Sequence, residues 1–350
     1  MKNGLILMTA LPPTVGHKFL IEFAREFMYS KFPKENVTIH VLVNSRDFEP
    51  LNDVYRADSL NRDICDPYGD VVIYSCKRND VPQTEKDHPD FWNFWKNLIT
   101  KYTRIDDFHY VFASEMYGIK LAQIFDAEFI PCDINREIFP ISATKVRKNT
   151  ILNFDKILPS LQEYLKTTVT FFGPESVGKT TASKMVYFSP TSCFRIPEYA
   201  RGYLETVGPE LTEEKMINII HGQNSLQINA NLIENYPFIL RDTDLLSTYG
   251  YYKLWQRKMP EYLPDLVKKS MANLYILMND EIPFTPDILR YGGNTRESNN
   301  YFWKYILKQF DANFYEVKSV SILSQREEIE EVMEKEFYKK ADMRHFQRER

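Results

Sequence analysis

The feature that most constrains the fold of this chain is a glycine-rich segment near its middle, residues 173–181, which reads Gly-Pro-Glu-Ser-Val-Gly-Lys-Thr-Thr. The six residues before it, 167–172, are β-branched or aromatic, as expected of a strand. A strand followed by the pattern G-x-x-x-x-G-K-[ST] predicts a loop that cradles the phosphates of a nucleoside triphosphate. Because such a domain begins with this strand and loop, the roughly 165 residues upstream are enough for a second domain.

The residue types of this loop suit a phosphate site. Gly173 and Gly178 let backbone N–H groups approach a phosphate closely, and the helix that opens near Lys179 directs its positive end there. We expect Lys179 to reach the β- and γ-phosphates of ATP and Thr180 to contact Mg²⁺. The other loop residues assigned to this ATP site are Glu175, Ser176 and Thr181.

Composition narrows the class of protein. With 350 residues, of which 43% are hydrophobic, the chain is long enough for two ordinary cores. Its net charge of −4 gives no bulk attraction for nucleic acid, and no segment approaches the roughly 18 apolar residues of a membrane span. The four cysteines are scattered without metal-like spacing, which favours a reduced compartment. We therefore expect a cytoplasmic protein that binds neither nucleic acid nor membrane, and the sequence leaves its oligomeric state open, a homo-oligomer included.

Apolar periodicity predicts an α/β fold with two doubly wound parallel-sheet domains, at 1–165 and 166–350. In the first half, the pattern predicts strands at 5–8, 37–43, 108–112 and 127–130, and helices at 17–29 and 116–125. In the second half, it predicts strands at 167–172, 237–240, 274–278 and 314–317, a further strand-like run at 193–196, a helix at 212–235, and a last helix that opens with a capping-box match at Ser324.

Two short motifs in the first half point to a separate triphosphate site. Pro12-Pro13-Thr14-Val15-Gly16-His17 follows the first predicted strand and leads into a helix, although His17 alone fits a packed or capping residue as well. Residues 141–147 read Ile-Ser-Ala-Thr-Lys-Val-Arg, so hydroxyls stand just before a helix and basic residues follow. Together the two motifs predict a site for a triphosphate.

These motifs resemble the [TH]-x-G-H and I-S-x-T-x-x-R signatures of the nucleotidylyltransferase superfamily. The resemblance implies a Rossmann-like sheet with an ATP site formed by Thr14, Gly16, His17, Ser142, Thr144 and Arg147. His17 and Arg147 would hold the triphosphate, because adenylyl transfer to a phosphate needs positioning and charge neutralisation rather than a strong base. Two positions depart from the common pattern: Thr14 stands where many members have His, and Met8 where many have Gly.

The first half further resembles the nicotinamide-mononucleotide adenylyltransferase branch at residues 112–118 and 133–136. Trp92 and Trp95 lie where that branch supplies an aromatic ring to stack on the nicotinamide, although a helix that buries aromatic core residues explains them equally well. The resemblance assigns Trp92, Asp133 and Arg136 to the mononucleotide.

Carboxylates follow two predicted strands of the second half. Asp242 comes after 237–240, where a Walker B carboxylate would lie, and Glu198 follows 193–196. Phosphoryl transfer to a hydroxyl uses one carboxylate near the acceptor and another that organises Mg²⁺. We assign Asp242 to Mg²⁺ or the acceptor and Glu198 to the acceptor, with an ordinary helix N-cap as the alternative for each.

The second half resembles the ribosylnicotinamide kinase domain of bifunctional NAD-salvage enzymes, through G-P-E-S-x-G-K-[ST], E-Y-A-R at 198–201, D-T-D-L-L-[ST]-T at 242–248, and D-x-x-P with D-x-x-R at 280–290. The resemblance implies that ATP phosphorylates nicotinamide riboside to nicotinamide mononucleotide, which a second ATP converts to NAD and pyrophosphate. Arg290 would belong to a lid over ATP, with an ordinary surface charge as the alternative. Some members carry an N-terminal helix-turn-helix, whereas this chain starts in its first strand, so no DNA binding is expected.

Three alternatives remain. A phosphopantetheine adenylyltransferase fused to a dephospho-coenzyme A kinase follows the same logic, but the runs at 198–201 and 242–244 argue against it. A regulator that senses NAD and ATP without turnover is compatible with Met8 and Thr14. A scaffold that uses ATP to switch partners is the third.

Overall fold

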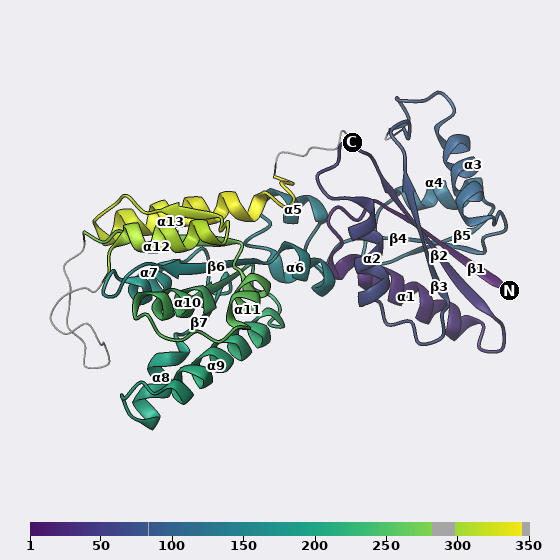
Figure 1. Cartoon of the computed structure of the whole chain (residues 1–350). Coiled ribbons are helices and arrows are strands. Elements are labelled where there is room, and N and C mark those ends of the chain that lie inside the picture. The colour runs from purple at the N-terminus through teal and green to yellow at the C-terminus, as the bar shows by residue number, and fades with distance from the viewer. Residues whose placement is uncertain (83, 282–297, 345–350) are drawn as a thin grey trace. The chain divides into compact units, whose positions relative to one another are not determined.

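The computed structural model describes residues 1–82, 84–281 and 298–344, which form two compact units (Figure 1). One unit is Met1–Tyr164 together with the described residues from Ala341 on, and the other is Leu165–Lys340. The division after Tyr164 lies one residue before the expected boundary. The described residues after Lys340 cluster with the first unit, whereas the sequence pattern assigns them to the second.

The first unit is built on a five-stranded sheet in which every neighbouring pair is parallel, in the order β3-β2-β1-β4-β5. Its strands are β1 (Lys2–Met8), β2 (Val37–Ser45), β3 (Val71–Lys77), β4 (Tyr110–Ala113) and β5 (Glu128–Pro131). Its helices are α1 (Val15–Lys31), α2 (Asp53–Asp63), α3 (Phe91–Thr103), α4 (Tyr117–Ile124), α5 (Ala143–Lys148) and α6 (Pro159–Leu165), with a 3₁₀ turn at Phe154–Lys156. The order reverses between β1 and β4, which is where doubly wound sheets bind ligands.

Both faces of this sheet are covered, as the alternation of side chains along β1 requires. Ile6 packs into a buried cluster with Leu20 and Ile21 of α1. Leu5 points to the opposite face, into a cluster that includes Trp95 and Leu98 of α3. A strand buried on both faces reads as a continuous apolar run, and this is why β1 is recognisable in the sequence.

The second unit repeats the architecture with a parallel sheet in the order β10-β9-β6-β8-β7. Its strands are β6 (Thr167–Phe172), β7 (Cys193–Ile196), β8 (Phe238–Arg241), β9 (Leu274–Leu277) and β10 (Phe314–Glu316). Its helices are α7 (Lys179–Met185), α8 (Tyr199–Val207), α9 (Glu213–Asn231), α10 (Leu245–Leu254), α11 (Leu263–Ser270), α12 (Asn300–Gln309) and α13 (Ile322–Tyr338). The fold prediction of two doubly wound α/β domains is confirmed.

Local differences from the sequence pattern concern the ends of elements, one strand, and several helices that had no prediction, among them α2, α10, α11 and α12. Ser321 caps α13 by accepting a hydrogen bond from the N–H of Ser324, so the helix starts before the expected capping box at Ser324. The strand β3 had no prediction of its own; it lies at the sheet edge, and of its seven residues only Cys76 is buried. Among the residues that the structure describes, no helix is both long and apolar enough to cross a bilayer.

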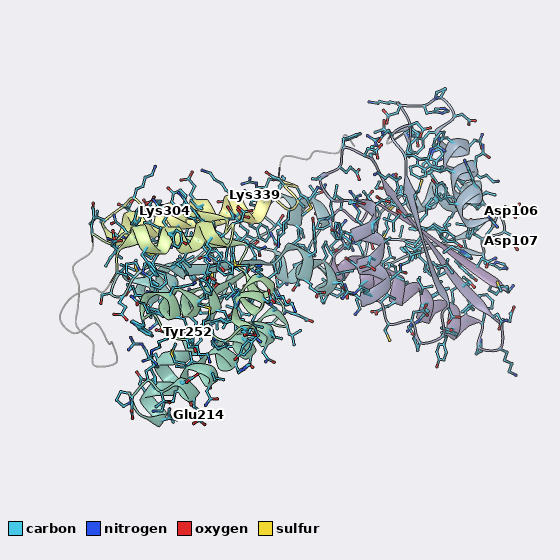
Figure 2. The ribbon with its side chains drawn as sticks, viewed as in Figure 1. Asp106, Asp107, Glu214, Tyr252, Lys304 and Lys339 are labelled. Carbon is cyan, nitrogen blue, oxygen red and sulfur yellow. The ribbon has the colours of Figure 1, made fainter. Side chains whose placement is uncertain are left out.

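In the second unit, Tyr252 of α10 lies in the interior, whereas Glu214 at the start of α9 and Lys339 after α13 lie at the surface (Figure 2).

The helices α10 and α12 pack closely, because Gly250 of α10 lies against the fully buried indole of Trp303 of α12. A Cβ atom on Gly250 would lie 2.4 Å from Cζ3 of Trp303. Trp303 in turn contacts the ring of Phe172 at the end of β6, with centroids 5.3 Å apart. This packing therefore supports the strand that leads into the phosphate loop.

We expect Gly250→Ala to lower the free energy of unfolding of the second unit by about 1–3 kcal/mol, because the added methyl group has no space. Gly202→Ala in α8 is the matched control: nothing lies within 4 Å of its Cβ position, and alanine favours a helix. Hydrogen exchange of peptides from the second unit, measured across a urea series, resolves the effect. Equal stability of the two variants would contradict this packing.

Candidate functional site

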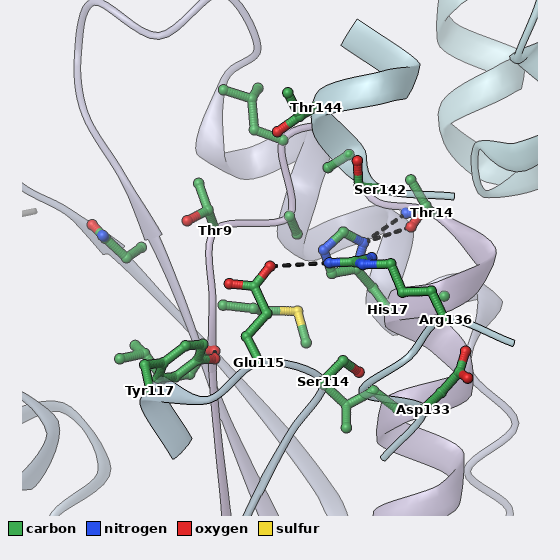
Figure 3. Close-up of a pocket in the computed structure, with 18 of the residues that line it drawn as sticks. Thr9, Thr14, His17, Ser114, Glu115, Tyr117, Asp133, Arg136, Ser142 and Thr144 are labelled. Atoms are coloured by element: carbon green, nitrogen blue, oxygen red, sulfur yellow. Dashed lines mark hydrogen bonds and ion pairs between the residues drawn. The ribbon is translucent and has the colours of Figure 1, made fainter. Parts of the chain in front are cut away.

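The first unit has a cavity of about 570 Å³ at the carboxyl ends of β1, β2 and β4 (Figure 3). It lies at the reversal of strand order, where loops from both halves of the sheet converge. The structure brings all predicted residues of this domain to its wall: Thr14, Gly16, His17, Trp92, Asp133, Arg136, Ser142, Thr144 and Arg147.

The imidazole of His17 is fixed by the start of α1. Thr14 is the N-cap, and its backbone N–H donates to Nδ1 of His17 over 3.1 Å, with the Thr14 hydroxyl 2.8 Å from the same nitrogen. Because Nδ1 accepts this bond, the neutral ring carries its proton on Nε2. Burial, and then the positive charges of Arg136 and Arg147, lower the pKa of His17 from 6.5 to about 4. His17 is thus both a capping residue and a neutral donor in the cavity.

The second motif starts α5 and directs its polar side chains to the same cavity. Ser142 is the N-cap and accepts a hydrogen bond from the N–H of Lys145 over 3.2 Å. Arg147 is buried; its Nη2 donates to the hydroxyl of Thr144 over 2.9 Å, and its Nη1 to the carbonyl of Leu11. The motif at 141–147 therefore connects directly to the loop after β1.

Arg136 and Asp133 have different surroundings, although both line the cavity. Arg136 donates to the carbonyl of Ile141 over 2.9 Å and pairs with Glu115 over 3.0 Å, beside His17 (Figure 3). Asp133 accepts hydrogen bonds from the backbone N–H groups of residues 137, 138 and 139, which hold its pKa below the usual value. Its carboxylate organises the loop before Ile141, a function that the motif did not predict.

An aromatic wall completes the cavity. Trp92 and Trp95 of α3 both line it, together with Phe91. Trp95 is also a core residue, 4% exposed, whereas Trp92 is half-buried and donates from Nε1 to Glu85 over 2.9 Å. Trp95 therefore fits the core interpretation of this aromatic run, whereas Trp92 is less buried at the cavity wall and its stacking on a nicotinamide ring stays a prediction.

Several wall residues had no prediction of their own. Glu115 and Tyr117 belong to the segment 112–118, whose resemblance was noted without a role for either side chain, and the hydroxyl of Tyr117 donates to the carbonyl of Leu7. Met8 occupies the wall at the end of β1 and is 8% exposed. No spacing in the sequence marks these residues, because their place depends on the register of β1 and β4.

The second unit has a cavity of about 210 Å³ around the loop between β6 and α7. The predicted residues on its wall are Glu175, Ser176, Gly178, Lys179, Thr180, Thr181, Glu198 and Asp242. Gly173 is not on the wall; it shapes the loop with a φ of 129°, a conformation that favours glycine. Arg290 lies outside the described residues.

The loop itself has the geometry of a phosphate cradle. Gly178, with a φ of 82°, is the N-cap of α7, so the first N–H groups of the helix face the cavity. Nζ of Lys179 donates to the carbonyls of Gly173 (3.0 Å) and Pro174 (2.7 Å). The hydroxyl of Thr180 donates to the carboxylate of Asp242 over 2.6 Å. Hard oxygen donors so close together suit Mg²⁺, which prefers oxygen ligands and keeps several waters.

Asp242 and Asp244, two residues apart in the chain, have different positions and partners. Asp242 meets Thr180 at the cavity, whereas Asp244 does not line it and caps α10, accepting from the N–H groups of Leu246 and Ser247. The hydroxyl of Tyr275 also donates to Asp244, over 2.7 Å. Burial raises the pKa of Asp244, partly offset by its positive neighbour Arg241 and by these hydrogen bonds. The N-cap alternative therefore applies to Asp244 rather than to Asp242.

Glu198 stands at the N-cap position of α8 but makes no capping hydrogen bond with its side chain. It is half-buried and faces the cavity. The adjacent N–H of Tyr199 is held instead by the buried amide of Gln223, over 3.0 Å, and that amide also donates to the carbonyl of Thr243. Gln223, which the sequence did not single out, thus ties α9 to the loops that carry both carboxylates.

The fold and the two cavities define an α/β protein with two separate sites lined by phosphate-binding motifs. A family model described as an AAA domain matches residues 168–326. The chain is homologous to NadR: it is 23% identical over 244 residues to the trifunctional NAD biosynthesis/regulator protein NadR of Salmonella typhimurium, and 24% identical over 220 residues to that of Escherichia coli. These matches cover 66% and 59% of this chain.

The chain spans little more than half the length of these curated relatives, 58% and 52%. Two solved structures also match: NadR in complex with NR, with a TM-score of 0.56 over 96% of both chains, and NadR in complex with NAD and AMP-PNP, with a TM-score of 0.55 over 100% of this chain and 98% of that chain. At 19% identity both establish a shared fold. The resemblance that the motifs predict is confirmed.

We expect His17 in the ligand-free protein to titrate near pH 4, well below an ordinary histidine. Since the unfolded chain binds this proton near pH 6.5, the residue's contribution to stability falls as the pH falls from about 6.5 to 4. A bound triphosphate adds negative charge beside the ring and should raise its pKa. NMR titration of the imidazole, with His17→Ala for assignment, tests both points; a free-protein pKa near 6.5 would contradict them.

We expect Asp242 and Asp244 to separate binding from stability. Asp244→Asn should lower the free energy of unfolding by about 1–3 kcal/mol, since a buried set of hydrogen bonds loses an acceptor. Asp242→Asn should leave stability nearly unchanged and weaken Mg·ATP binding at the second cavity at least tenfold. Calorimetric titration in a His17→Ala background, which weakens nucleotide binding at the first cavity, measures the affinity. Equal destabilisation by both variants would contradict the distinction.

Proposed function

We propose that the chain is a bifunctional NAD salvage enzyme. Its second unit phosphorylates nicotinamide riboside at the ribose 5′-hydroxyl, and its first unit transfers the adenylyl group of ATP to the resulting nicotinamide mononucleotide, giving NAD and pyrophosphate. The observation that carries the proposal is that each cavity combines a phosphate-binding motif with an aromatic wall. Nicotinamide riboside and nicotinamide mononucleotide carry the same flat ring, and such a ring stacks well on an aromatic side chain.

In the second cavity, the acceptor side is apolar and aromatic. Tyr251 and Trp255 stack on each other with centroids 4.9 Å apart and line the same cavity as the phosphate loop residues. A cationic pyridinium is well matched to such a face. The neighbouring apolar side chains of the wall are Leu204, Leu211, Met216 and Ile219.

Four polar side chains in this cavity suit phosphoryl transfer. The 5′-hydroxyl oxygen forms a bond to the γ-phosphorus of ATP while the bond from that phosphorus to the ADP oxygen breaks, and the hydroxyl proton passes to Glu198. Lys179 binds the transferring phosphoryl group, and Thr180 with Asp242 would hold Mg²⁺, which neutralises charge on the phosphates. Asp242 contacts Thr180, and the two would hold Mg²⁺ together. We therefore assign the proton of the acceptor hydroxyl to Glu198.

In the first cavity, the acceptor is already an anion. A phosphate oxygen of the mononucleotide attacks the α-phosphorus of ATP, and the bond from that phosphorus to pyrophosphate breaks. No strong base is needed, so the work of the site is to align both phosphates and to stabilise the developing charge. His17, through Nε2–H, and Arg147 supply donors for the triphosphate, with Thr14, Ser142 and Thr144 around them.

The relatives support the same conclusion. The curated proteins are named for NAD biosynthesis and regulation, and the two solved structures carry NR in one case and NAD with AMP-PNP in the other. Because this chain spans only part of the curated proteins, we extend their biosynthetic role to it as a proposal.

We expect two variants to separate the activities. Lys179→Ala should lower riboside phosphorylation at least 100-fold and spare NAD formation from the mononucleotide, while His17→Ala should do the reverse, since each removes a donor from one site. Chromatography of incubations with Mg·ATP and either substrate measures the products, and chelation of Mg²⁺ should stop riboside phosphorylation.

Phosphopantetheine serves as the control acceptor for the coenzyme A alternative. Wild-type protein that makes neither the mononucleotide nor NAD would leave a sensing or scaffold role. Loss of both steps in one folded variant would contradict two separate sites.

A further inference from the structure

The loop between β1 and α1, residues 9–14, contains a strained residue at the wall of the first cavity. Ala10 has a φ of 47° and is 1% exposed. A residue with a Cβ atom in this left-handed region costs about 1 kcal/mol or more relative to glycine, so the surrounding structure must hold it there. This loop ends in Thr14, and His17 follows in the first turn of α1; both are central to the proposed adenylyl-transfer site.

Arginines hold the carbonyl groups on both sides of Ala10. Nη1 of Arg147, from α5, donates to the carbonyl of Leu11. Nη1 of Arg56, from α2, donates to the carbonyl of Thr9 over 3.3 Å. The next alternate carbonyl, that of Pro13, accepts from the N–H of Leu158 over 3.2 Å. Three alternate carbonyl groups of the loop, those of Thr9, Leu11 and Pro13, are therefore held by hydrogen bonds, which we call its anchors. The donor of the first anchor, Arg56, lies outside the predicted motifs.

Arg56 is suited to act as a fixed anchor. It is fully buried and does not line the cavity. Its guanidinium pairs with the buried carboxylate of Glu49 over 2.6 Å and donates to the carbonyl of Leu51 from Nε (3.1 Å) and Nη2 (2.6 Å). The planar fork of an arginine fills these positions together, which the single ammonium group of a lysine cannot do.

We propose that Arg56 is a positioning residue for adenylyl transfer, acting through the Thr9 carbonyl to hold Ala10 in its left-handed conformation. This inference rests on the proposed function of the first unit. Arg56 touches no substrate; together with Arg147 it sets the path of the loop, and the loop sets where the N-cap Thr14 and the ring of His17 meet the triphosphate. The charge of Arg56 is balanced by Glu49, so it stabilises the loop without adding positive charge to the cavity.

A double-mutant cycle between Arg56→Lys and Ala10→Gly tests this inference on the full chain. Arg56→Lys keeps the charge beside Glu49 but loses the fork; we expect the KM for ATP in NAD formation to rise at least fivefold. Ala10→Gly removes the cost of the left-handed conformation, so in the Arg56→Lys background it should recover at least half of that change on a logarithmic scale. The single variant Ala10→Gly provides the reference.

The controls separate positioning from stability. Arg62→Lys, on the exposed side of α2, should leave the KM for ATP unchanged, since Arg62 pairs only with surface acids in the described contacts. A variant that merely unfolds in part loses active molecules, which lowers kcat at constant KM. Riboside phosphorylation by the second unit, measured in the same samples, should stay within twofold of wild type.

Each outcome decides the matter. A raised KM that Ala10→Gly recovers supports the proposal. A KM within twofold of wild type in Arg56→Lys, a loss confined to kcat, or a raised KM without recovery would overturn it. If Arg56→Lys yields no folded protein, the double variant Arg56→Met/Glu49→Gln takes its place with the same expectation, because it removes the donors to the Thr9 carbonyl and leaves no buried charge unpaired. Wild-type protein that forms no NAD contradicts the proposed function itself, whereas active wild type with unaffected variants contradicts only the role of Arg56.

Discussion

Both cavities depend on the parallel pairing of one central strand with its two neighbours. In the first unit, β1 pairs with β2 and β4; in the second, β6 pairs with β8 and β9, all in parallel. Parallel pairing brings the carboxyl ends of these strands to one edge, and the reversal of strand order leaves a crevice there. The phosphate-binding loops follow β1 and β6, so each motif reaches its partners only because the sheets have this topology.

The motifs with fixed spacing were predictable because their chemistry is local. A glycine-rich turn, a lysine and a hydroxyl at the start of a helix describe a phosphate cradle whatever the rest of the chain does, and the wall of the second cavity contains Lys179 and Thr180 as expected. The junction of β1 and α1 is local in the same sense, since Thr14 and His17 lie one helical turn apart. Their meeting with Arg147 needed the family resemblance, because no periodicity relates positions so far apart in the chain.

The sequence alone could not distinguish two residues of the same type in one motif, and it could not show which residues far apart in the chain contact each other. Asp242 and Asp244 stand in one motif, and only the burial of Asp244 against Tyr275 and the contact of Asp242 with Thr180 distinguish them. Asp133 reads as a ligand-binding acid, yet three backbone N–H groups of its own loop take up its carboxylate. Likewise, nothing in the letters around Arg56 connects it to Glu49 or to Thr9. These assignments follow from packing, which depends on the whole fold.

The first cavity combines two fixed cations, Arg136 and Arg147, with the neutral imidazole ring of His17. Arg136 is paired with Glu115, and Arg147 is held by a carbonyl and a hydroxyl, so both guanidinium groups are oriented by hydrogen bonds to protein groups. Their positive field, added to burial, keeps His17 neutral with Nδ1 occupied. In the proposed adenylyl transfer, a neutral donor beside two cations would bind the triphosphate without the repulsion among cations that a third positive charge would add, and its proton would lie on Nε2, the nitrogen not engaged by Thr14. Such an arrangement works only if the backbone that carries the ring is rigid, and this rigidity is what the anchors at Thr9, Leu11 and Pro13 provide.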